Sequence, residues 1–285
     1  NNLLKPSDGG PVAVPSQDMV LGIYYLTQER PGVKGEGKFF KSLNEAILAY
    51  ENGVITLHSR IKVRVTKTVN GEEKTATVES TLGRFLFNEI IPQDLGFVDR
   101  SIPGNELLLE VDFLVGKKQN KQILQRVINT HGATVTAEVL DKIKATGYKY
   151  STRAAMTVSI SEMTVPPQKP QMIQEAQDTV DRITKNFKRG LITEEERYKE
   201  VIETWKNTDD ALTKALLNGL DKYNNIFMMA DSGARGSDKQ IKQLAGMRGL
   251  MADTTGRTIE LPIKSNFREG LDVLEYFMSA HGARK

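Results

Sequence analysis

Two long stretches with apolar residues at helical spacing, separated by a short connection, constrain the fold of this chain most. Their apolar stripes are Met172 or Ile173, Ala176, Val180, Ile183 and Phe187 in the first, and Tyr198, Val201, Ile202, Trp205, Leu212 and Leu216 in the second. Gly190 is typical of a helix end, and Thr193 with Glu196 forms a capping box that opens the next helix. The pattern predicts an antiparallel helical hairpin over residues 166–225. The sequence leaves open whether this hairpin is a structural coiled coil or presents its tip to a partner.

The residues before the hairpin carry mixed signals. Loop residues over 1–32 surround one apolar stretch, Met19–Leu26, which fits a short helix or a strand. Ser42–Glu51 has the spacing of a helix. Alternating residues over Val54–Val78, with an Asn70-Gly71 turn, predict a β-hairpin.

Two further helices are predicted over Lys118–His131 and Ala137–Thr146, with Gly147 ending the second. Pro166, Pro167 and Pro170 interrupt helix continuity, so we expect a domain boundary after residue 165. The predicted fold class is therefore α+β: a mixed domain with short strands and helices, then the helical hairpin, then a C-terminal loop-helix segment.

The C-terminal region predicts one more helix. Asn266 is a suitable cap with Glu269 three residues on. Apolar or aromatic residues then follow at helical spacing, namely Leu271, Leu274, Met278 and His281. The chain has no initiator Met and no capping residue after the last helical pattern, so we expect it to be a piece of a longer protein, cut within a helix.

Composition excludes several classes of protein. The 39 basic and 36 acidic residues give a net charge of only +3, so any contact with nucleic acid must be local. Without cysteine, neither disulfides nor a thiolate metal site can form. We find no 18-residue apolar run and no signal pattern, and we expect a cytoplasmic protein without a membrane partner.

The three histidines, His58, His131 and His281, lack the spacing of metal ligands. Asp209 and Asp210 are expected to be a surface pair.

The stretch Ser232-Gly-Ala-Arg-Gly-Ser237 is the strongest candidate for a binding site. Gly233 and Gly236 allow a ligand to approach the backbone closely. Ser237 with Gln240 predicts a capping box, and helix N-termini favour phosphate. Arg235 adds a planar cation with several donors at the same place. The pattern indicates an anion site, with an ordinary solvated loop as the alternative; a nucleotide P-loop is excluded because its Gly-Lys-Ser/Thr end is missing.

Longer motifs carry a family resemblance. They are Asn225–Ser237 (NIFMMADSGARGS), Gln243–Met251 (QLAGMRGLM), Asn266–Leu271 (NFREGL), His281–Lys285 (HGARK), Pro15-Ser-Gln-Asp18 and Lys34-Gly-Glu-Gly37. In this order, over the whole chain, they resemble the beta-prime subunit family of bacterial RNA polymerases. The resemblance implies a DNA-directed RNA polymerase, which is a nucleotidyltransferase, located in the cytoplasm at the nucleoid.

The resemblance also assigns parts to the chain. Residues 1–165 correspond to the pore domain beside the secondary channel, and residues 166–225 to the hairpin at the rim of the funnel. Residues 226–265 correspond to the F-loop region, and residues 266–285 to the first half of the bridge helix. The alternative is a non-catalytic module that docks regulators through its hairpin.

For the site, the resemblance implies that Arg235 reaches the triphosphate of the incoming nucleotide and that Gln17 faces the same channel. No catalytic or metal-binding residue is implied here, since the aspartate motif Asn-Ala-Asp-Phe-Asp-Gly-Asp, which holds the family's Mg²⁺, does not occur. The Zn²⁺-binding cysteines of the family are missing too. Implied partners are the beta, alpha, omega and sigma subunits, template DNA, RNA, nucleoside triphosphates, and secondary-channel transcription factors at the hairpin.

Overall fold

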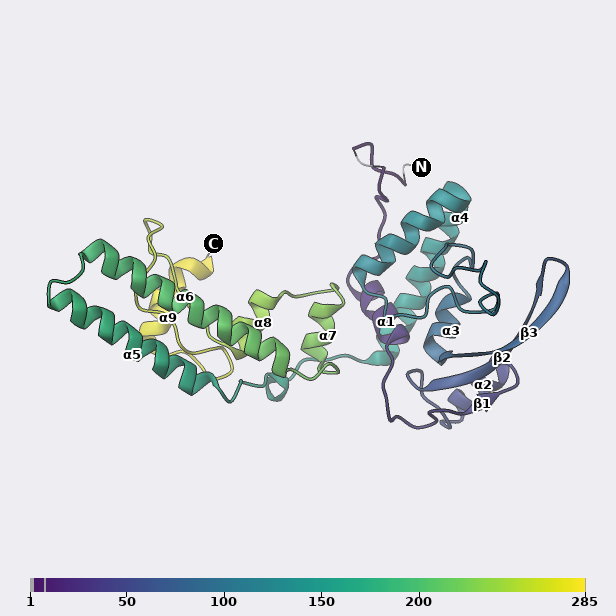
Figure 1. Ribbon diagram of the computed structural model, residues 1–285, viewed down its shortest axis with the longest axis horizontal. Coiled ribbons are helices and arrows are strands. Elements are labelled where there is room, and N and C mark those ends of the chain that lie inside the picture. Colours follow the sequence, from purple (N-terminus) through teal and green to yellow (C-terminus); the bar gives the residue numbers. More distant parts are fainter. Residues whose placement is uncertain (1–2, 8, 285) are drawn as a thin grey trace. The chain divides into compact units, whose positions relative to one another are not determined.

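The computed structural model describes residues 3–7 and 9–284, without the side chains of residues 281–284. The chain divides into two compact units. The first contains residues 1–156 together with 231–235, and the second contains residues 157–230 and 236–285. The short segment 231–235 therefore packs with residues far from it in sequence. Figure 1 shows the helices and strands of both units.

The first unit begins with helix α1 (Asp18–Thr27), strand β1 (Phe39–Phe40) and helix α2 (Leu43–Glu51). The long strands β2 (Arg60–Val69) and β3 (Glu72–Thr81) form an antiparallel hairpin, and β1 joins β2 in parallel, giving the order β1-β2-β3. Asn70 and Gly71 both have positive φ, of 53° and 84°, as a two-residue type I′ turn requires. The predicted β-hairpin is confirmed, although its first strand starts at Arg60 rather than Val54.

Helix α3 (Leu82–Asn88) follows directly, and α4 (Lys117–Ala154) completes the unit. Helix α4 consists of two helical segments that meet at Gly132, whose φ of 80° and ψ of −174° are not helical. The core of the unit joins the sheet to α1, α3 and α4. Its fully buried members include Ile23, Leu26, Ile61, Val63, Leu82, Phe87, Ile123, Leu124 and Ile143.

The prediction that Gly147 ends a helix is wrong. The helix continues to Ala154, where Ala155 takes the left-handed conformation with φ 47°. Gly147 instead allows α1 to approach: a Cβ on Gly22 would lie 1.8 Å from the carbonyl oxygen of Gly147, and one on Gly147 would lie 2.6 Å from that of Met19. Close packing of the two helices requires glycine at both positions. A single sequence does not distinguish a glycine that permits such packing from a glycine that ends a helix.

The second unit is built on the predicted hairpin, since α5 (Lys169–Lys188) and α6 (Glu194–Gly219) lie antiparallel in Figure 1. Gly190 has φ 75°, its N–H donates to Phe187 O at 2.8 Å, and the N–H of Leu191 donates to Asn186 O at 3.1 Å. These are the two bonds of a Schellman motif. The Thr193–Glu196 capping box forms as predicted. The core of the hairpin also includes a residue from the chain after α8. Its buried members are Ala176, Ile183, Val201, Trp205, Leu212 and Met247.

The remaining elements of this unit are short. A 3₁₀ turn, η1 (Ile160–Glu162), precedes the hairpin, and α7 (Asn225–Asp231), α8 (Asp238–Ala245) and α9 (Val273–Arg284) follow it. The mixed fold confirms the predicted α+β class. Among the described residues, no helix is long and apolar enough to cross a bilayer.

The predicted start of the last helix is wrong. Asn266 does accept a hydrogen bond from the N–H of Glu269 at 2.9 Å, but Gly270, with φ 83°, ends this single turn. Helix α9 starts at Val273, where Asp272 accepts from the N–H of Glu275 at 2.7 Å and Glu275 accepts from the N–H of Asp272 at 3.2 Å. The sequence contains two capping signals here, and the glycine between them decides which one begins the helix. The side chain of His281 lies outside the described residues.

Candidate functional site

The segment 231–237, between the end of α7 and the start of α8, carries the predicted anion site. Gly233 and Gly236 have φ of 73° and 92°, a conformation that favours glycine. Ser237 is the extended N-cap residue of α8, as predicted, but its side chain accepts no capping hydrogen bond, so the predicted Ser237–Gln240 capping box is wrong. The N–H of Gln240 instead donates to the carbonyl oxygen of Ser237 at 2.9 Å.

The first residues of this segment are anchored on α1 and α4. The hydroxyl of Tyr24 donates to Asp231 Oδ2 at 2.7 Å, and the N–H of Lys117, at the start of α4, donates to the carbonyl oxygen of Ser232 at 2.8 Å. A Cβ on Gly116 would lie 3.1 Å from that same carbonyl oxygen, and a Cβ on Gly233 would lie 3.1 Å from Lys117 Cβ. Glycine at both positions therefore permits the backbones to approach.

Arg235 follows this anchored stretch and is exposed. Within residues 3–7 and 9–284, its guanidinium forms neither a hydrogen bond nor an ion pair with another residue. Its neighbour Ala234 is nearly buried, and Ser232 Oγ accepts the N–H of Ala234 at 3.2 Å. The segment thus fixes its own backbone while leaving one cation available for a ligand.

Gln17, the second predicted site residue, is the N-cap residue of α1 and is exposed. Its φ of 48° and ψ of −121° belong to a region that glycine normally occupies, and such a conformation costs about 1–3 kcal/mol. Its side chain forms no capping hydrogen bond. In the described part of the chain no hydrogen bond joins Gln17 to Arg235, although α1 also carries Tyr24, which binds the Arg235 segment through Asp231.

A cavity of about 510 Å³ borders the anchored residues. The charged groups around it are four lysines and one aspartate, Lys5, Lys117, Lys118, Lys121 and Asp231. The lysines are exposed, and none forms an ion pair within the described residues. Three of them lie in the first turns of α4, whose N-terminus also carries partial positive charge. The cavity therefore attracts anions.

The tyrosine that anchors the segment is buried, with 2% of its surface exposed. Burial, followed by the hydrogen bond to Asp231 and the negative charge of that carboxylate, raises the pKa of Tyr24 above its ordinary value. The hydroxyl therefore keeps its proton and remains a donor to Asp231 throughout the physiological pH range. Sequence analysis missed this residue, because the contact joins positions 207 apart.

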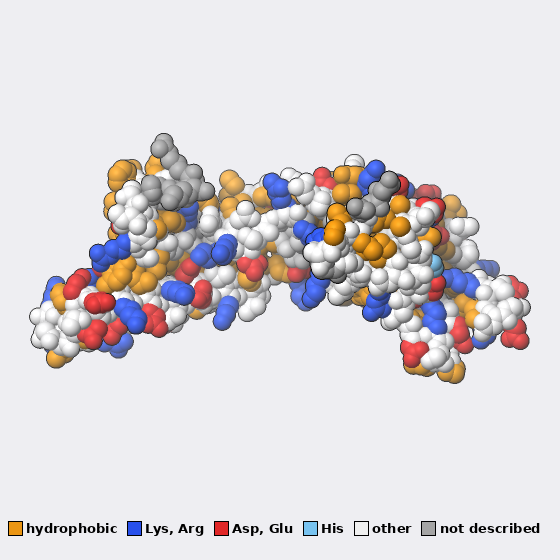
Figure 2. All heavy atoms as spheres, turned by 90° about the horizontal axis from the view of Figure 1, so that it is seen from above, with side chains coloured by type: hydrophobic (Ala, Val, Ile, Leu, Met, Phe, Trp, Pro, Cys, Tyr) orange, Lys and Arg blue, Asp and Glu red, His pale blue; other side chains and the backbone are white. Residues whose placement is uncertain are grey.

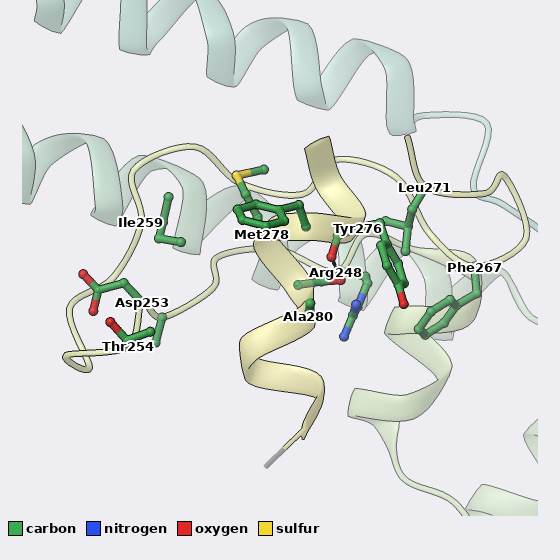
Figure 3. A pocket seen from close by; sticks show the side chains of 12 residues that line it. Arg248, Asp253, Thr254, Ile259, Phe267, Leu271, Tyr276, Met278 and Ala280 are labelled. Carbon is green, nitrogen blue, oxygen red and sulfur yellow. Dashed lines mark hydrogen bonds between the residues drawn. The ribbon is translucent and has the colours of Figure 1, made fainter. Parts of the chain in front are cut away.

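A second cavity, of about 750 Å³, lies in the second unit (Figure 3). Its walls come from the loop with Asp253 and Ile259, from Phe267, and from the α9 residues Tyr276 and Met278. The guanidinium of Arg248 lies 4.9 Å from the ring centre of Phe267. Helix α9 exposes apolar side chains, with Val273 87% and Phe277 79% exposed.

In residues 3–7 and 9–284, no group of three or more His, Asp or Glu side chains is arranged so that it could hold a metal ion. The described residues therefore do not fit a catalytic Mg²⁺.

The expectation that Asp209 and Asp210 form a surface pair is wrong for Asp209. Its side chain is 16% exposed and binds Lys242 Nζ at 2.5 Å, because α8 packs on α6 there. Burial raises the pKa of Asp209, although the bond to Lys242 acts against it.

Charges of both signs are interspersed on the face shown in Figure 2, which fits the low net charge. The lysine-lined cavity is thus a local basic feature. Anion binding by this chain must depend on particular residues rather than on a general attraction.

Comparisons with known proteins agree over the whole chain. The family model for RNA polymerase Rpb1, domain 3, matches residues 2–163, and that for RNA polymerase Rpb1, domain 4, matches residues 192–268. The chain is 76% identical to the DNA-directed RNA polymerase subunit beta′ of Lachnoclostridium phytofermentans, 60% to that of Acetivibrio thermocellus and 59% to that of Clostridium acetobutylicum. Each alignment includes all of this chain but only 23–24% of the relative. The chain spans about a quarter of these relatives and belongs to the family of RNA polymerase largest subunits, Rpb1 and beta′.

Proposed function

We propose that this chain is a segment of the beta′ subunit of a DNA-directed RNA polymerase, where it lines the channel through which nucleoside triphosphates reach the active centre. In this proposal Arg235 binds the triphosphate of the incoming nucleotide, and Gln17 faces the same channel. The observation that carries the proposal is the anchored segment 231–235, from which Arg235 extends without an acidic partner in the described structure.

The chemistry of the segment suits a triphosphate. A guanidinium donates two parallel hydrogen bonds to phosphate oxygens, and its charge persists at any physiological pH. The lysines near Ser232 increase the local concentration of anions before a specific contact forms. Gly233 and Gly236 leave no side chain between the backbone and a ligand.

The reaction itself is assigned to other parts of the enzyme. Metal-assisted nucleotidyl transfer would need carboxylates to hold Mg²⁺, which would stabilise the charge that develops in the reaction. The described residues hold no such cluster, and we assign no catalytic residue to this chain. The purified chain alone is therefore expected to extend no primer on any template with Mg²⁺; template-dependent extension would disprove this assignment.

Replacement of Arg235 in the assembled polymerase tests the proposal. Losing a charge-assisted hydrogen bond costs about 1.5–3 kcal/mol, so Arg235→Ala should raise the KM for nucleoside triphosphates about tenfold to a hundredfold. Arg235→Lys should restore part of the effect, since a lysine keeps the charge but lacks the planar fork. The measurement is single-nucleotide addition at increasing nucleotide concentration. An unchanged KM for Arg235→Ala, with normal subunit assembly, would mean that the segment is only a structural turn.

A second function is favoured by the tip of the α5–α6 hairpin. Leu191, between the Schellman motif and the capping box, is 68% exposed although it is apolar. We propose that this tip docks transcription factors that enter through the channel, while the channel function is retained. Leu191→Asp in the assembled polymerase should weaken the binding of such a factor and leave the KM for nucleotides unchanged; undiminished binding would exclude the tip as a docking site.

A further inference from the structure

We propose that Tyr24 is a positioning residue for the nucleotide site: its hydroxyl bond to Asp231 fixes the segment that presents Arg235. The inference rests on the proposed function of Arg235. Tyr24 itself touches neither nucleotide nor metal in this account. It acts through the loop.

The Tyr24 side chain is suited to this role because its hydroxyl bonds to the segment and its ring is buried. The ring is buried within the first unit and cannot move without disturbing the packing of α1. The hydroxyl bond to Asp231 Oδ2, at 2.7 Å, has the length of a strong bond between a hydroxyl and a carboxylate. Asp231 forms no ion pair among the described residues, so Tyr24 is a principal restraint on its carboxylate.

The second restraint on the segment is the bond from the N–H of Lys117 to the carbonyl oxygen of Ser232. Two neighbouring residues, Asp231 and Ser232, are thus held by two different helices, α1 and α4. When the Tyr24 bond is removed, the segment keeps its bond to α4 but loses the one to α1. The glycine that follows, Gly233, then allows the chain to take other conformations, and Arg235 occupies its binding position for a smaller fraction of the time.

Helix α1 would also coordinate two residues of the proposed site. Gln17 occupies its N-cap position and Tyr24 lies seven residues later, a distance of about 10 Å along the axis at 1.5 Å per residue. The strained backbone of Gln17 and the buried bond of Tyr24 belong to one rigid element. Because α1 is rigid, it fixes the position of Gln17 relative to Tyr24 and to the segment that Tyr24 binds.

Tyr24→Phe in the assembled polymerase tests the inference, because it removes the hydroxyl and keeps the ring. We expect the KM for nucleoside triphosphates to rise about threefold to tenfold, with little change in the rate at saturating nucleotide, since the bound nucleotide selects the competent loop. Asp231→Ala should have the same effect, and Asp231→Asn a smaller one, because an amide oxygen still accepts from the tyrosine. Tyr25→Phe is the matched control: this neighbouring tyrosine packs against His58, and in the described structure it forms no hydrogen bond to residues 231–235.

A double substitution separates the inference from the function on which it rests. If Tyr24 acts through Arg235, adding Tyr24→Phe to Arg235→Ala should raise the KM no further, whereas additive effects would overturn the inference. Hydrogen exchange at residues 232–235 gives a readout independent of nucleotide. We expect faster exchange in Tyr24→Phe than in Tyr25→Phe. This expectation holds even if Arg235→Ala leaves the KM unchanged, because an unchanged KM would contradict only the proposed function of Arg235. Equal exchange in the two variants would show that Tyr24 does not position the segment.

Discussion

At the scale of single residues, His58 is a titratable group that the fold keeps neutral. Burial is the largest cause and lowers the pKa of His58 to about 4, while the hydrogen bond between Nδ1 and the Gln28 carbonyl oxygen, at 2.9 Å, acts in the opposite direction. Tyr25 packs edge-on against the imidazole, with ring centres 4.6 Å apart. The histidine therefore links Gln28, just after α1, to the loop that precedes β2.

This burial predicts a loss of stability in mild acid. The unfolded chain takes up a proton near the ordinary histidine pKa of about 6.5, whereas the folded chain does so only near 4. Unfolding is thus favoured as the pH falls between these values, and at pH 5 the wild type should lose about 2 kcal/mol relative to pH 7.5 through this group. Urea unfolding at the two pH values measures the loss. His58→Asn, which can still donate to Gln28, should show a smaller acid loss than wild type; an equal loss in both would assign it to other groups.

At the scale of helices, the crossing of α1 and α4 depends on Gly22 and Gly147. A Cβ at position 22 would lie 1.8 Å from a backbone carbonyl oxygen, which no side-chain rotation can relieve. Gly22→Ala should therefore separate the helices and lower the free energy of unfolding by about 3 kcal/mol. Gly219→Ala is the control, since nothing lies within 4 Å of a Cβ there and alanine favours helix. Denaturant unfolding of both variants makes the comparison; a Gly22→Ala protein as stable as wild type would mean that the crossing is not tight.

Elements with local signals were predictable from the sequence. The α5–α6 hairpin and the Asn70-Gly71 turn are specified by residues close together in the chain, such as Gly190 and the Thr193 cap. Gly147 was misinterpreted because a glycine that ends a helix and one that admits a neighbouring helix look alike in sequence. The start of α9 was misplaced because two capping signals compete there, at Asn266 and Asp272.

The candidate site was predictable only in part, because only residues close together in the chain carry a recognisable signal. Arg235 lies between two glycines, a local pattern that indicates a loop open to a ligand. The residues that anchor this loop, Tyr24 and Lys117, are more than 100 positions away and carry no signal of the contact. Their roles require the tertiary structure.

At the scale of the whole molecule, this chain spans about a quarter of the relatives it matches. The proposed role as a segment of a larger polymerase fits its ordinary cores, its low net charge and the exposed apolar residues of α9. An apolar helix surface of this kind is typical of a contact with other protein. In the proposed function, Arg235 contacts the nucleotide within the assembled polymerase.

Protection of residue 235 by nucleotide is a direct test of this contact. These 285 residues contain no cysteine, so Arg235→Cys introduces a thiol that peptide mapping can follow in the assembled polymerase, and Leu191→Cys at the exposed hairpin tip provides the control. Alkylation rates are measured with a 3′-deoxy-terminated RNA, so that the matching nucleoside triphosphate, at saturating concentration, binds without being added. We expect the nucleotide to slow alkylation at position 235 and to leave the rate at position 191 unchanged. Equal rates at position 235 with and without nucleotide would contradict it.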